Sequence, residues 1–262
     1  MDPTVRQERP SPPGSAGTRV ESAAKTHVGK VRRINEDACL DRAALGLWAV
    51  ADGVGGWHAG DRASGLVVEL LGSIEDGTAG AALLAAVRER LESANAQLLR
   101  EAETTGRPSA TTVVVLLISG RYFACVWAGD SRLYLWRAGQ LRQLTRDHTE
   151  AQALVDAGLM TIEEAERQTN RNAIARAVGA GANLDLEMLQ ASLEDGDIFL
   201  LCTDGLTKMA RDEEIAATLP GASPRIVATA LLDLALERGA VDNVTVVAIR
   251  CSVAPLPSGP AG

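Results

Sequence analysis

The sequence has 262 residues, of which 46% are hydrophobic, and a chain of this length can bury about 75% of the surface that its unfolded form exposes. Its formal net charge of −8 argues against a protein that binds the phosphate backbone of nucleic acids, because that contact requires clustered Lys and Arg. No apolar run reaches the roughly 20 residues needed to cross a bilayer, which argues against a membrane protein.

The two ends of the chain differ in composition from the middle. Residues 1–20 and 254–262 are rich in Pro, Gly and polar side chains, and we expect them to be disordered tails. The start of the sequence lacks the basic and then apolar segments of a secretory leader. We therefore expect a soluble, cytoplasmic domain over residues 21–253, with no Pro/Gly/Ser-rich linker to divide it.

The first part of this domain predicts strands followed by helices. Residues 22–29 and 38–52 have strand composition on either side of a turn. Residues 62–74 and 81–103 then show helical patterns. In the second of these helices, the apolar residues that recur on one face are Leu83, Val87, Leu91, Ala94 and Leu98.

The middle of the domain predicts a block of strands. Residues 110–118, 121–129 and 131–139 are short runs of β-branched or aromatic residues. Gly-containing connections of hairpin length separate them, and connections so short can join antiparallel strands but cannot hold a parallel crossover. The sequence therefore favours an antiparallel sheet here.

The last part of the domain alternates between helices and strands. Two short helices are predicted at 149–158 and 161–168, the second with Thr161 and Glu164 as a capping box. A strand at 195–205 comes next. Ser223, Pro224 and Gly239 then bound a helix over 223–239, and residues 243–250 form a final strand. Strand blocks that alternate with helical pairs predict an α+β fold of antiparallel sheets covered by helices.

Several aspartates stand where apolar strands meet turns. Asp52 and Asp204 each follow a buried-type run and precede glycine, and the others are Asp37, Asp130 and Asp242. Taken singly, each also fits an ordinary turn, where Asp bonds nearby backbone amides. Taken together, five carboxylates in one place would repel one another by about 4 kcal/mol per pair at ~4 Å and an effective dielectric near 20.

Repulsion of this size requires either protonation or bound cations. Oxygen-only ligands suit hard ions such as Mg²⁺ or Mn²⁺ rather than zinc, which prefers His and Cys. Gly53 has no side chain, so its carbonyl can approach an ion closely. We therefore expect a divalent-metal site if the strand ends converge.

Eight motifs occur in an order that resembles the metal-dependent protein phosphatases of type 2C, the compact bacterial members in particular. They span roughly residues 22–250, and their shared order is far more specific than any single Asp-Gly pair. The motifs are VRRINED, VADGVGG, SATT, AGDSRLYLWRAGQLRQLTRDHT, LVDAGLMTIEEA, NAIARAVG, LLCTDGLT and DNVTVV.

The resemblance implies a four-layer α/β/β/α sandwich, in which two antiparallel β-sheets are flanked by helices and two metal ions lie at one end. It implies Asp52, Asp204 and Asp242 as direct ligands of Mn²⁺ or Mg²⁺, with the Gly53 carbonyl on the second ion. The first motif contributes an acidic pair. We favour Asp37 near the second ion, through water, with Glu36 as the rival.

The resemblance assigns further roles around this centre. Asp130 matches the residue that supports a third, weaker ion together with Asp204, and Asn243 is expected to orient Asp242. Arg32 matches the arginine that grips substrate phosphate, a role that suits a guanidinium fork. Residues 151–179 resemble the flap beside the active site.

The implied reaction is hydrolysis of phosphoserine or phosphothreonine in proteins by a metal-activated water, without a phosphoenzyme. Many bacterial relatives carry His directly after the Gly-Gly of the second motif, where this chain has Trp57 and then His58. The hypothesis is that His58 or a metal-bound water protonates the leaving group. The alternative is that His58 is a solvated loop residue.

The expected partners are phosphorylated proteins and a Ser/Thr kinase that the enzyme opposes, with no nucleic-acid or membrane partner and a monomeric state. Two other functions compete with this interpretation. One is a non-catalytic module of the same fold that binds phosphoproteins, and the other is a phosphoesterase for a small metabolite. The retained Asp52, Asp204, Asp242 and Arg32 favour the enzyme over the binding module.

Overall fold

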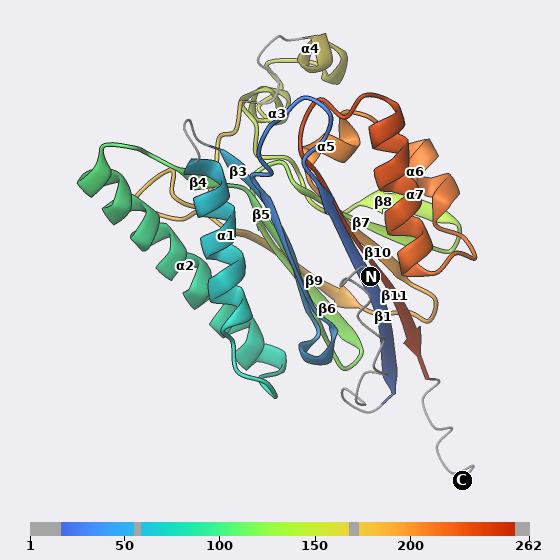
Figure 1. The fold of residues 1–262 in the computed structure, drawn as a ribbon. Coiled ribbons are helices and arrows are strands. Elements are labelled where there is room, and N and C mark those ends of the chain that lie inside the picture. Colours follow the sequence, from blue (N-terminus) through green and yellow to red (C-terminus); the bar gives the residue numbers. More distant parts are fainter. Residues whose placement is uncertain (1–16, 55–58, 168–172, 255–262) are drawn as a thin grey trace, which may run out of the picture.

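Two antiparallel sheets face each other, and helices cover their outer faces (Figure 1). The computed structural model describes residues 17–54, 59–167 and 173–254. The predicted α+β fold of two antiparallel sheets flanked by helices is confirmed.

The first sheet brings together strands from both ends of the chain. The N-terminal strand β1 pairs along its whole length with the C-terminal strand β11, from Thr18 opposite Val253 to His27 opposite Val244. The strand order is β1 (Thr18–His27), β11 (Val244–Val253), β10 (Ile198–Cys202), β7 (Arg132–Arg137) and β8 (Gln140–Gln143).

The second sheet is built mainly from consecutive strands. A short strand, β4 (Ala110–Thr111), pairs with the end of β3 just before β5 begins. A single-turn helix at Ala43–Leu45 connects β2 to β3. The strand order is β2 (Asp37–Arg42), β3 (Leu47–Val54), β5 (Val113–Ser119), β6 (Tyr122–Ala128) and β9 (Glu187–Ser192).

Helices complete the outer layers. α1 (Ala59–Gly72) and α2 (Gly80–Thr105) cover the second sheet. The first sheet is covered by α5 (Asp204–Thr207), α6 (Asp212–Thr218) and α7 (Pro224–Glu237). In the part of the chain that the structure describes, no helix combines the length and apolar character needed to cross a bilayer.

Two short helices, α3 (Glu150–Asp156) and α4 (Ile162–Arg167), project beyond the layers at the top of Figure 1. The predicted capping box of α4 is confirmed, because the Thr161 backbone N–H donates to Glu164 at 2.8 Å and the Glu164 N–H donates to the Thr161 hydroxyl at 3.2 Å. These helices lie within the segment predicted to be a flap. Residues 168–172 lie outside the described residues.

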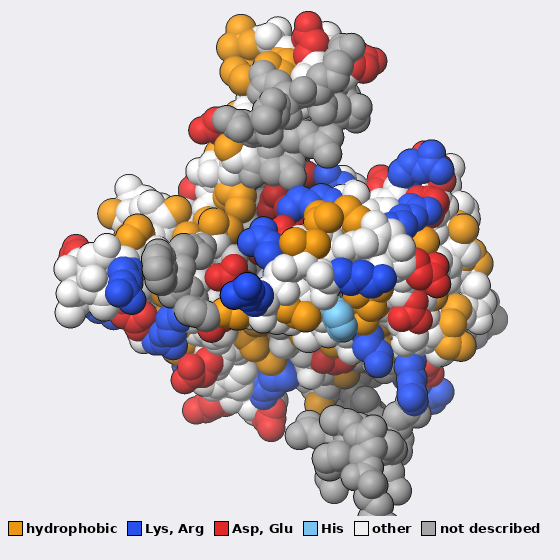
Figure 2. Space-filling model, turned by 45° about the horizontal axis from the view of Figure 1, so that its top comes forward, with side chains coloured by type: hydrophobic (Ala, Val, Ile, Leu, Met, Phe, Trp, Pro, Cys, Tyr) orange, Lys and Arg blue, Asp and Glu red, His pale blue; other side chains and the backbone are white. Residues whose placement is uncertain are grey.

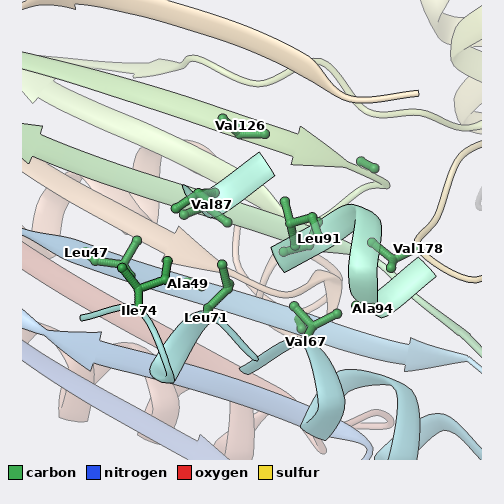
Figure 3. Packing of buried hydrophobic residues seen from close by; sticks show 14 of the residues in the cluster. Leu47, Ala49, Val67, Leu71, Ile74, Val87, Leu91, Ala94, Val126 and Val178 are labelled. Carbon is green, nitrogen blue, oxygen red and sulfur yellow. The ribbon is translucent and has the colours of Figure 1, made fainter. Parts of the chain in front are cut away.

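The central strands are buried on both faces, which explains their nearly continuous apolar sequences. Along β3, Trp48 and Val50 point between the two sheets, whereas Leu47 and Ala49 point towards α1 and α2. The alternation follows from the period of two in a strand. Figure 3 shows the outer cluster, where Leu71 of α1 lies beside Leu47 and Ala49, and Val67 lies further along the same helix.

The predicted helical face of α2 is buried as expected. Leu83, Val87, Leu91, Ala94 and Leu98 are each at most 1% exposed and belong to this outer cluster. The spacing of three and four residues therefore identified the face that packs on the sheet.

The sequence pattern missed several elements. The strands β8 and β9 are mostly exposed or polar, so they lack the alternation that marks a half-buried strand. β1 begins at Thr18, inside the segment predicted to be a tail, because strand pairing with Val253 orders an edge whose sequence is polar. The helix α6 was also missed.

We expect Leu91→Ala to lower the free energy of unfolding by about 2–5 kcal/mol, because Leu91 is fully buried and truncation leaves a cavity. Urea denaturation followed by circular dichroism measures this change. Ile226→Ala is the control, since Ile226 is 60% exposed on α7 and its truncation creates no cavity. Equal stability of Leu91→Ala and the parent would contradict the packing of α2 described here.

Candidate metal and phosphate site

The sheet topology carries the five predicted aspartates to the same end of the sandwich. Register places Asp37, at the start of β2, opposite Asp52 near the end of β3. Asp204 follows β10 and Asp242 precedes β11, and these strands are antiparallel neighbours. Asp130 lies in the turn between β6 and β7, next to the same edge. Residues far apart in sequence thus meet through strand pairing.

Asp52 is held by the SATT motif. Its backbone N–H donates to the Thr112 hydroxyl at 3.1 Å, and its carbonyl accepts from the Thr112 N–H and the Thr111 hydroxyl. The Thr112 hydroxyl also lies 2.7 Å from that of Ser131, directly after Asp130. These two threonines therefore fix the backbone of Asp52 and tie it to the turn that carries Asp130.

Asp37 is buried between the two sheets. Its Oδ2 accepts hydrogen bonds from Thr245 at 2.7 Å and Thr203 at 2.9 Å, one from β11 and one from the end of β10. Its Oδ1 is buried and has no hydrogen-bond partner among the described residues. Burial raises the pKa of Asp37 to about 7, although the two hydroxyls act to lower it and the charges of Asp204 and Asp242 add to the rise.

Asp130 and Asp204 each present an unpartnered oxygen as well. The Oδ1 atoms of both are buried and accept no hydrogen bond from the residues described. Burial, followed by the charge of Asp204, raises the pKa of Asp130 to about 7. Burial and the neighbouring aspartates also raise the pKa of Asp52 well above its usual value. A buried carboxylate oxygen without a hydrogen-bond donor is unfavourable, and a nearby cation would stabilise it.

Two cations of the chain itself reach the other aspartates. Arg32 contacts both carboxylate oxygens of Asp242, with Nε 3.0 Å from Oδ1 and Nη2 3.1 Å from Oδ2. The Lys208 ammonium lies 2.6 Å from Asp204 Oδ2 and 3.0 Å from Asp242 Oδ2. Lys208 was not predicted from the sequence, although its position four residues after Asp204 on a helical turn places the two on one face.

Asn243 organises the loop that carries the first motif. Its side-chain Nδ2 donates to the backbone carbonyls of Val28 and Ile34, and its side-chain Oδ1 accepts from the Glu36 N–H at 2.8 Å. Its own N–H donates to Asp242 Oδ1 at 3.1 Å. Asn243 therefore contacts Asp242 through its backbone, while its side chain holds residues 28–36 in place.

Glu36 and Gly53 lie together at the start of α1. The Glu36 carbonyl accepts from the Gly53 N–H at 3.0 Å and from the Ser64 hydroxyl at 2.6 Å. A Cβ added to Gly53 would lie 2.0 Å from the Gly60 carbonyl oxygen. Glycine at 53 is therefore needed for packing, because it allows the close approach of α1, besides any role of its carbonyl.

The two acidic residues of the first motif differ in their relation to Asp52. The charge of Asp37 is among those that raise the pKa of Asp52, whereas Glu36 is not among them.

The donor set fits hard divalent ions. The available oxygens belong to carboxylates, and Oδ1 of Asp37, Asp130 and Asp204 is buried without a hydrogen-bond partner among the described residues. Carboxylate oxygens are the kind of donor that Mg²⁺ and Mn²⁺ prefer. Across residues 17–54, 59–167 and 173–254, no three His, Cys, Asp or Glu side chains already converge as a preformed metal site. Groups of the protein itself contact oxygens of three of these aspartates. Lys208 contacts Asp204 and Asp242, Arg32 contacts Asp242, and two threonine hydroxyls donate to Asp37.

Figure 2 brings this end of the molecule forward. Blue Lys and Arg side chains stand at several points on it, among acidic and hydrophobic ones, although the whole chain is acidic. Arg32 is half-exposed, so its guanidinium reaches the surface beside Asp242. The end of the sandwich therefore presents positive groups above buried carboxylates. His58, the residue considered for leaving-group protonation, lies outside the described residues, as does Trp57 before it.

The base of the predicted flap joins this end of the sandwich through backbone contacts. Thr149 and Ile174 form an isolated bridge, and Thr111 forms another with Val178. His148 stacks on Trp127 and accepts from the Gly129 N–H at 3.2 Å through Nδ1. The segment thus begins and ends beside the residues that hold Asp52 and Asp130.

Comparison with known proteins decides the family. The family model described as protein phosphatase 2C matches residues 16–244. The chain belongs to the protein phosphatase 2C family. The relatives described next are bacterial Ser/Thr phosphatases, and the aspartates described above stand within the matched region.

Two relatives illustrate the match to this family. The chain is 40% identical over 229 residues to the serine/threonine protein phosphatase PstP of Mycobacterium tuberculosis, covering 86% of this chain and 44% of PstP. It is 31% identical over 238 residues to the serine/threonine phosphatase stp of Listeria welshimeri, covering 86% of this chain and 94% of that protein. The chain therefore spans less than half the length of PstP but nearly all of stp.

A solved structure of a protein phosphatase 2C relative adds information on metal binding. The catalytic domain of PstP in complex with two manganese ions superposes with a TM-score of 0.81 and 36% identity, covering 90% of this chain and 99% of that one. The fold that surrounds the aspartates is therefore shared with a protein that binds two manganese ions.

We expect the metal-free protein to lose stability as the pH rises from about 4 to about 7. Asp37 and Asp130 have a pKa of about 7 when folded, against an ordinary aspartate pKa of 3.8. Between these values the folded state keeps protons that the unfolded state releases, so stability falls with rising pH and levels off above about 7. Urea denaturation with a chelator at several pH values measures this.

Asp130→Asn removes one of these titrating groups and is expected to make the decline shallower. Asp233→Asn, on the exposed face of α7, is the matched control and should keep the slope of the parent. Stability that stays level or rises across this range in the parent would contradict the burial of ionisable carboxylates at the site.

Proposed function

We propose that this chain hydrolyses phosphoserine and phosphothreonine in proteins and requires divalent metal ions. The observation that carries the proposal is the gathering of Asp37, Asp52, Asp130, Asp204 and Asp242 at one end of the sandwich, where Asp37, Asp130 and Asp204 each have a buried oxygen without a hydrogen-bond partner among the described residues. Membership of the protein phosphatase 2C family, and relatives named Ser/Thr phosphatases, supports the reaction class.

Asp52, Asp204 and Asp242, with the Gly53 carbonyl, would hold two ions, Mn²⁺ or Mg²⁺. Asp37 would contribute through water, with Glu36 as the less favoured alternative, and Asp130 with Asp204 would hold a third, weaker ion. When bound, such ions supply a water of lowered pKa and offset the negative charge at the phosphoryl group. The catalytic domain of PstP, solved in complex with two manganese ions, supports manganese as the first metal to test.

The chain's own residues would position the substrate. The Arg32 guanidinium already grips a carboxylate through two nitrogens, and the same planar fork suits two oxygens of a phosphate. Asn243 fixes the loop that carries Arg32 by bonding the carbonyls of Val28 and Ile34. Residues 151–179 would act as a flap that helps select the phosphopeptide.

We also propose the partners, the location and the oligomeric state of the enzyme. Its substrates would be phosphoproteins of a cognate Ser/Thr kinase, whose action it would reverse in the cytoplasm, and it would act as a monomer. The names of the bacterial relatives support Ser/Thr phosphatase activity, on which this pairing with a kinase is built. A non-catalytic binding module and a metabolite phosphoesterase are the alternatives that a turnover experiment separates.

We expect Mn²⁺-dependent hydrolysis of a phosphothreonine peptide, and Asp204→Asn should lower its rate by about 100-fold or more, because a metal ligand is lost. Phosphate release with and without a chelator measures it. Asp233→Asn is the control and should match the parent. A chain that binds the peptide without Mn²⁺-dependent turnover would support the binding module. Faster turnover of sugar phosphates than of peptides would support the metabolite enzyme.

We further expect His58→Ala to slow hydrolysis of the phosphothreonine peptide by about 10²-fold while leaving that of p-nitrophenyl phosphate nearly unchanged. An alkoxide leaving group needs a proton, whereas p-nitrophenolate is stable without one. Steady-state rates on both substrates provide the measurement. Unchanged rates on both would remove His58 as the general acid.

A further inference from the structure

Lys208 occupies a position within the carboxylate cluster that the proposed function does not use. Its ammonium lies 2.6 Å from Asp204 and 3.0 Å from Asp242, and its side chain is 25% exposed. Both aspartates are proposed metal ligands. An ammonium at hydrogen-bond distance from two such ligands stands where a divalent ion would need their oxygens.

The local structure holds Lys208 there. It is the C-cap of α5, and its backbone N–H donates to the Asp204 carbonyl at 2.8 Å, so its side chain emerges one helical turn after Asp204. An ordinary lysine side chain is protonated at neutral pH, and two carboxylates within 3.0 Å favour that charged form. The group is therefore an ammonium at neutral pH.

The pairing within the cluster is uneven. Among the described residues, Lys208 and Arg32 are the cations that form ion pairs with these five aspartates, and both contact Asp242 Oδ2. Asp37 and Asp130 form no ion pair with these cations, and Asp37, Asp130 and Asp204 each keep a buried Oδ1 without a hydrogen-bond partner among the same residues. The protein cations thus contact only Asp204 and Asp242, and they leave Oδ1 of Asp204 unpaired.

We propose that Lys208 is an internal competitor of the metal ion, which must displace the Lys208 ammonium from Asp204 and Asp242 in order to bind. This proposal rests on the proposed function, since it takes these aspartates as metal ligands. An ammonium and a divalent cation repel each other strongly at contact distance, so they cannot share the same carboxylate oxygens. The partial exposure of the Lys208 side chain gives it a path outwards into solvent.

Lys208 could have the opposite role and favour metal binding, and a measurement of metal affinity separates the two roles. If Lys208 instead holds Asp204 and Asp242 in the arrangement that a metal needs, its removal weakens metal binding. Competition predicts tighter binding after removal. The sign of the change in affinity therefore decides.

The first experiment measures Mn²⁺ binding to the full chain by isothermal titration calorimetry. We expect Lys208→Met, which keeps the length of the side chain but removes the charge, to bind Mn²⁺ about tenfold more tightly than the parent. Lys30→Met is the matched control, because Lys30 is exposed in the loop near Asp242 and has no ion pair among the described residues. It removes the same charge and should leave the affinity within about twofold.

A second measurement keeps the test independent of enzyme activity. Without metal, Lys208→Met should unfold at a lower temperature than the parent, because Asp204 and Asp242 lose a counter-ion. Saturating Mn²⁺ should raise its melting temperature by more than it raises that of the parent. Lys208→Arg retains the positive charge and should show no gain in Mn²⁺ affinity.

The outcomes are distinct. Equal or weaker Mn²⁺ binding by folded Lys208→Met would overturn the competitor role while leaving the metal site and the proposed function in place. Tighter binding by Lys30→Met to the same extent would also overturn it, since the effect would then come from net charge. A parent protein that binds no Mn²⁺ would overturn the proposed function and, with it, this inference.

Discussion

Burial of like charges at the ends of paired strands is the constraint on which the rest of this site depends. Five aspartates lie where strands from both sheets end, and burial together with mutual repulsion raises the pKa of Asp37, Asp52, Asp130 and Asp204. Repulsion of this kind is tolerable only if protons, protein cations or metal ions offset the charge. The structure shows raised carboxyl pKa values, ion pairs of Lys208 and Arg32 with these aspartates, and buried carboxylate oxygens that have no hydrogen-bond partner among the described residues.

The scaffold around the aspartates is correspondingly rigid. Thr111 and Thr112 fix the backbone of Asp52, Thr203 and Thr245 hold Asp37, and Asn243 secures the loop that bears Arg32. Such supporting contacts are what keep ligands within the narrow tolerances of metal and phosphate chemistry. The sandwich of two sheets provides this rigidity because its central strands are buried on both faces, and the family that shares the fold is named for phosphatase activity.

The sequence predicted the parts of this arrangement that carry a strong local signal. The apolar runs before Asp52 and Asp204 marked strand ends, and the spacing of Leu83, Val87 and Leu91 marked the packed face of α2. Weak local signals account for the misses. β9 is mostly exposed and mixes polar and apolar residues without regular alternation, so only its pairing with β6 reveals it as a strand. Lys208 looks like a surface lysine after a turn, and its contact with Asp242 depends on the pairing of β10 with β11.

Anomalous scattering from crystals soaked in manganese tests the central claim most directly. The account predicts two adjacent manganese peaks bounded by Asp52, Asp204 and Asp242, with the Lys208 ammonium moved away from the carboxylates. Manganese bound elsewhere on the surface, with the aspartates still held by Lys208 and Arg32, would contradict it.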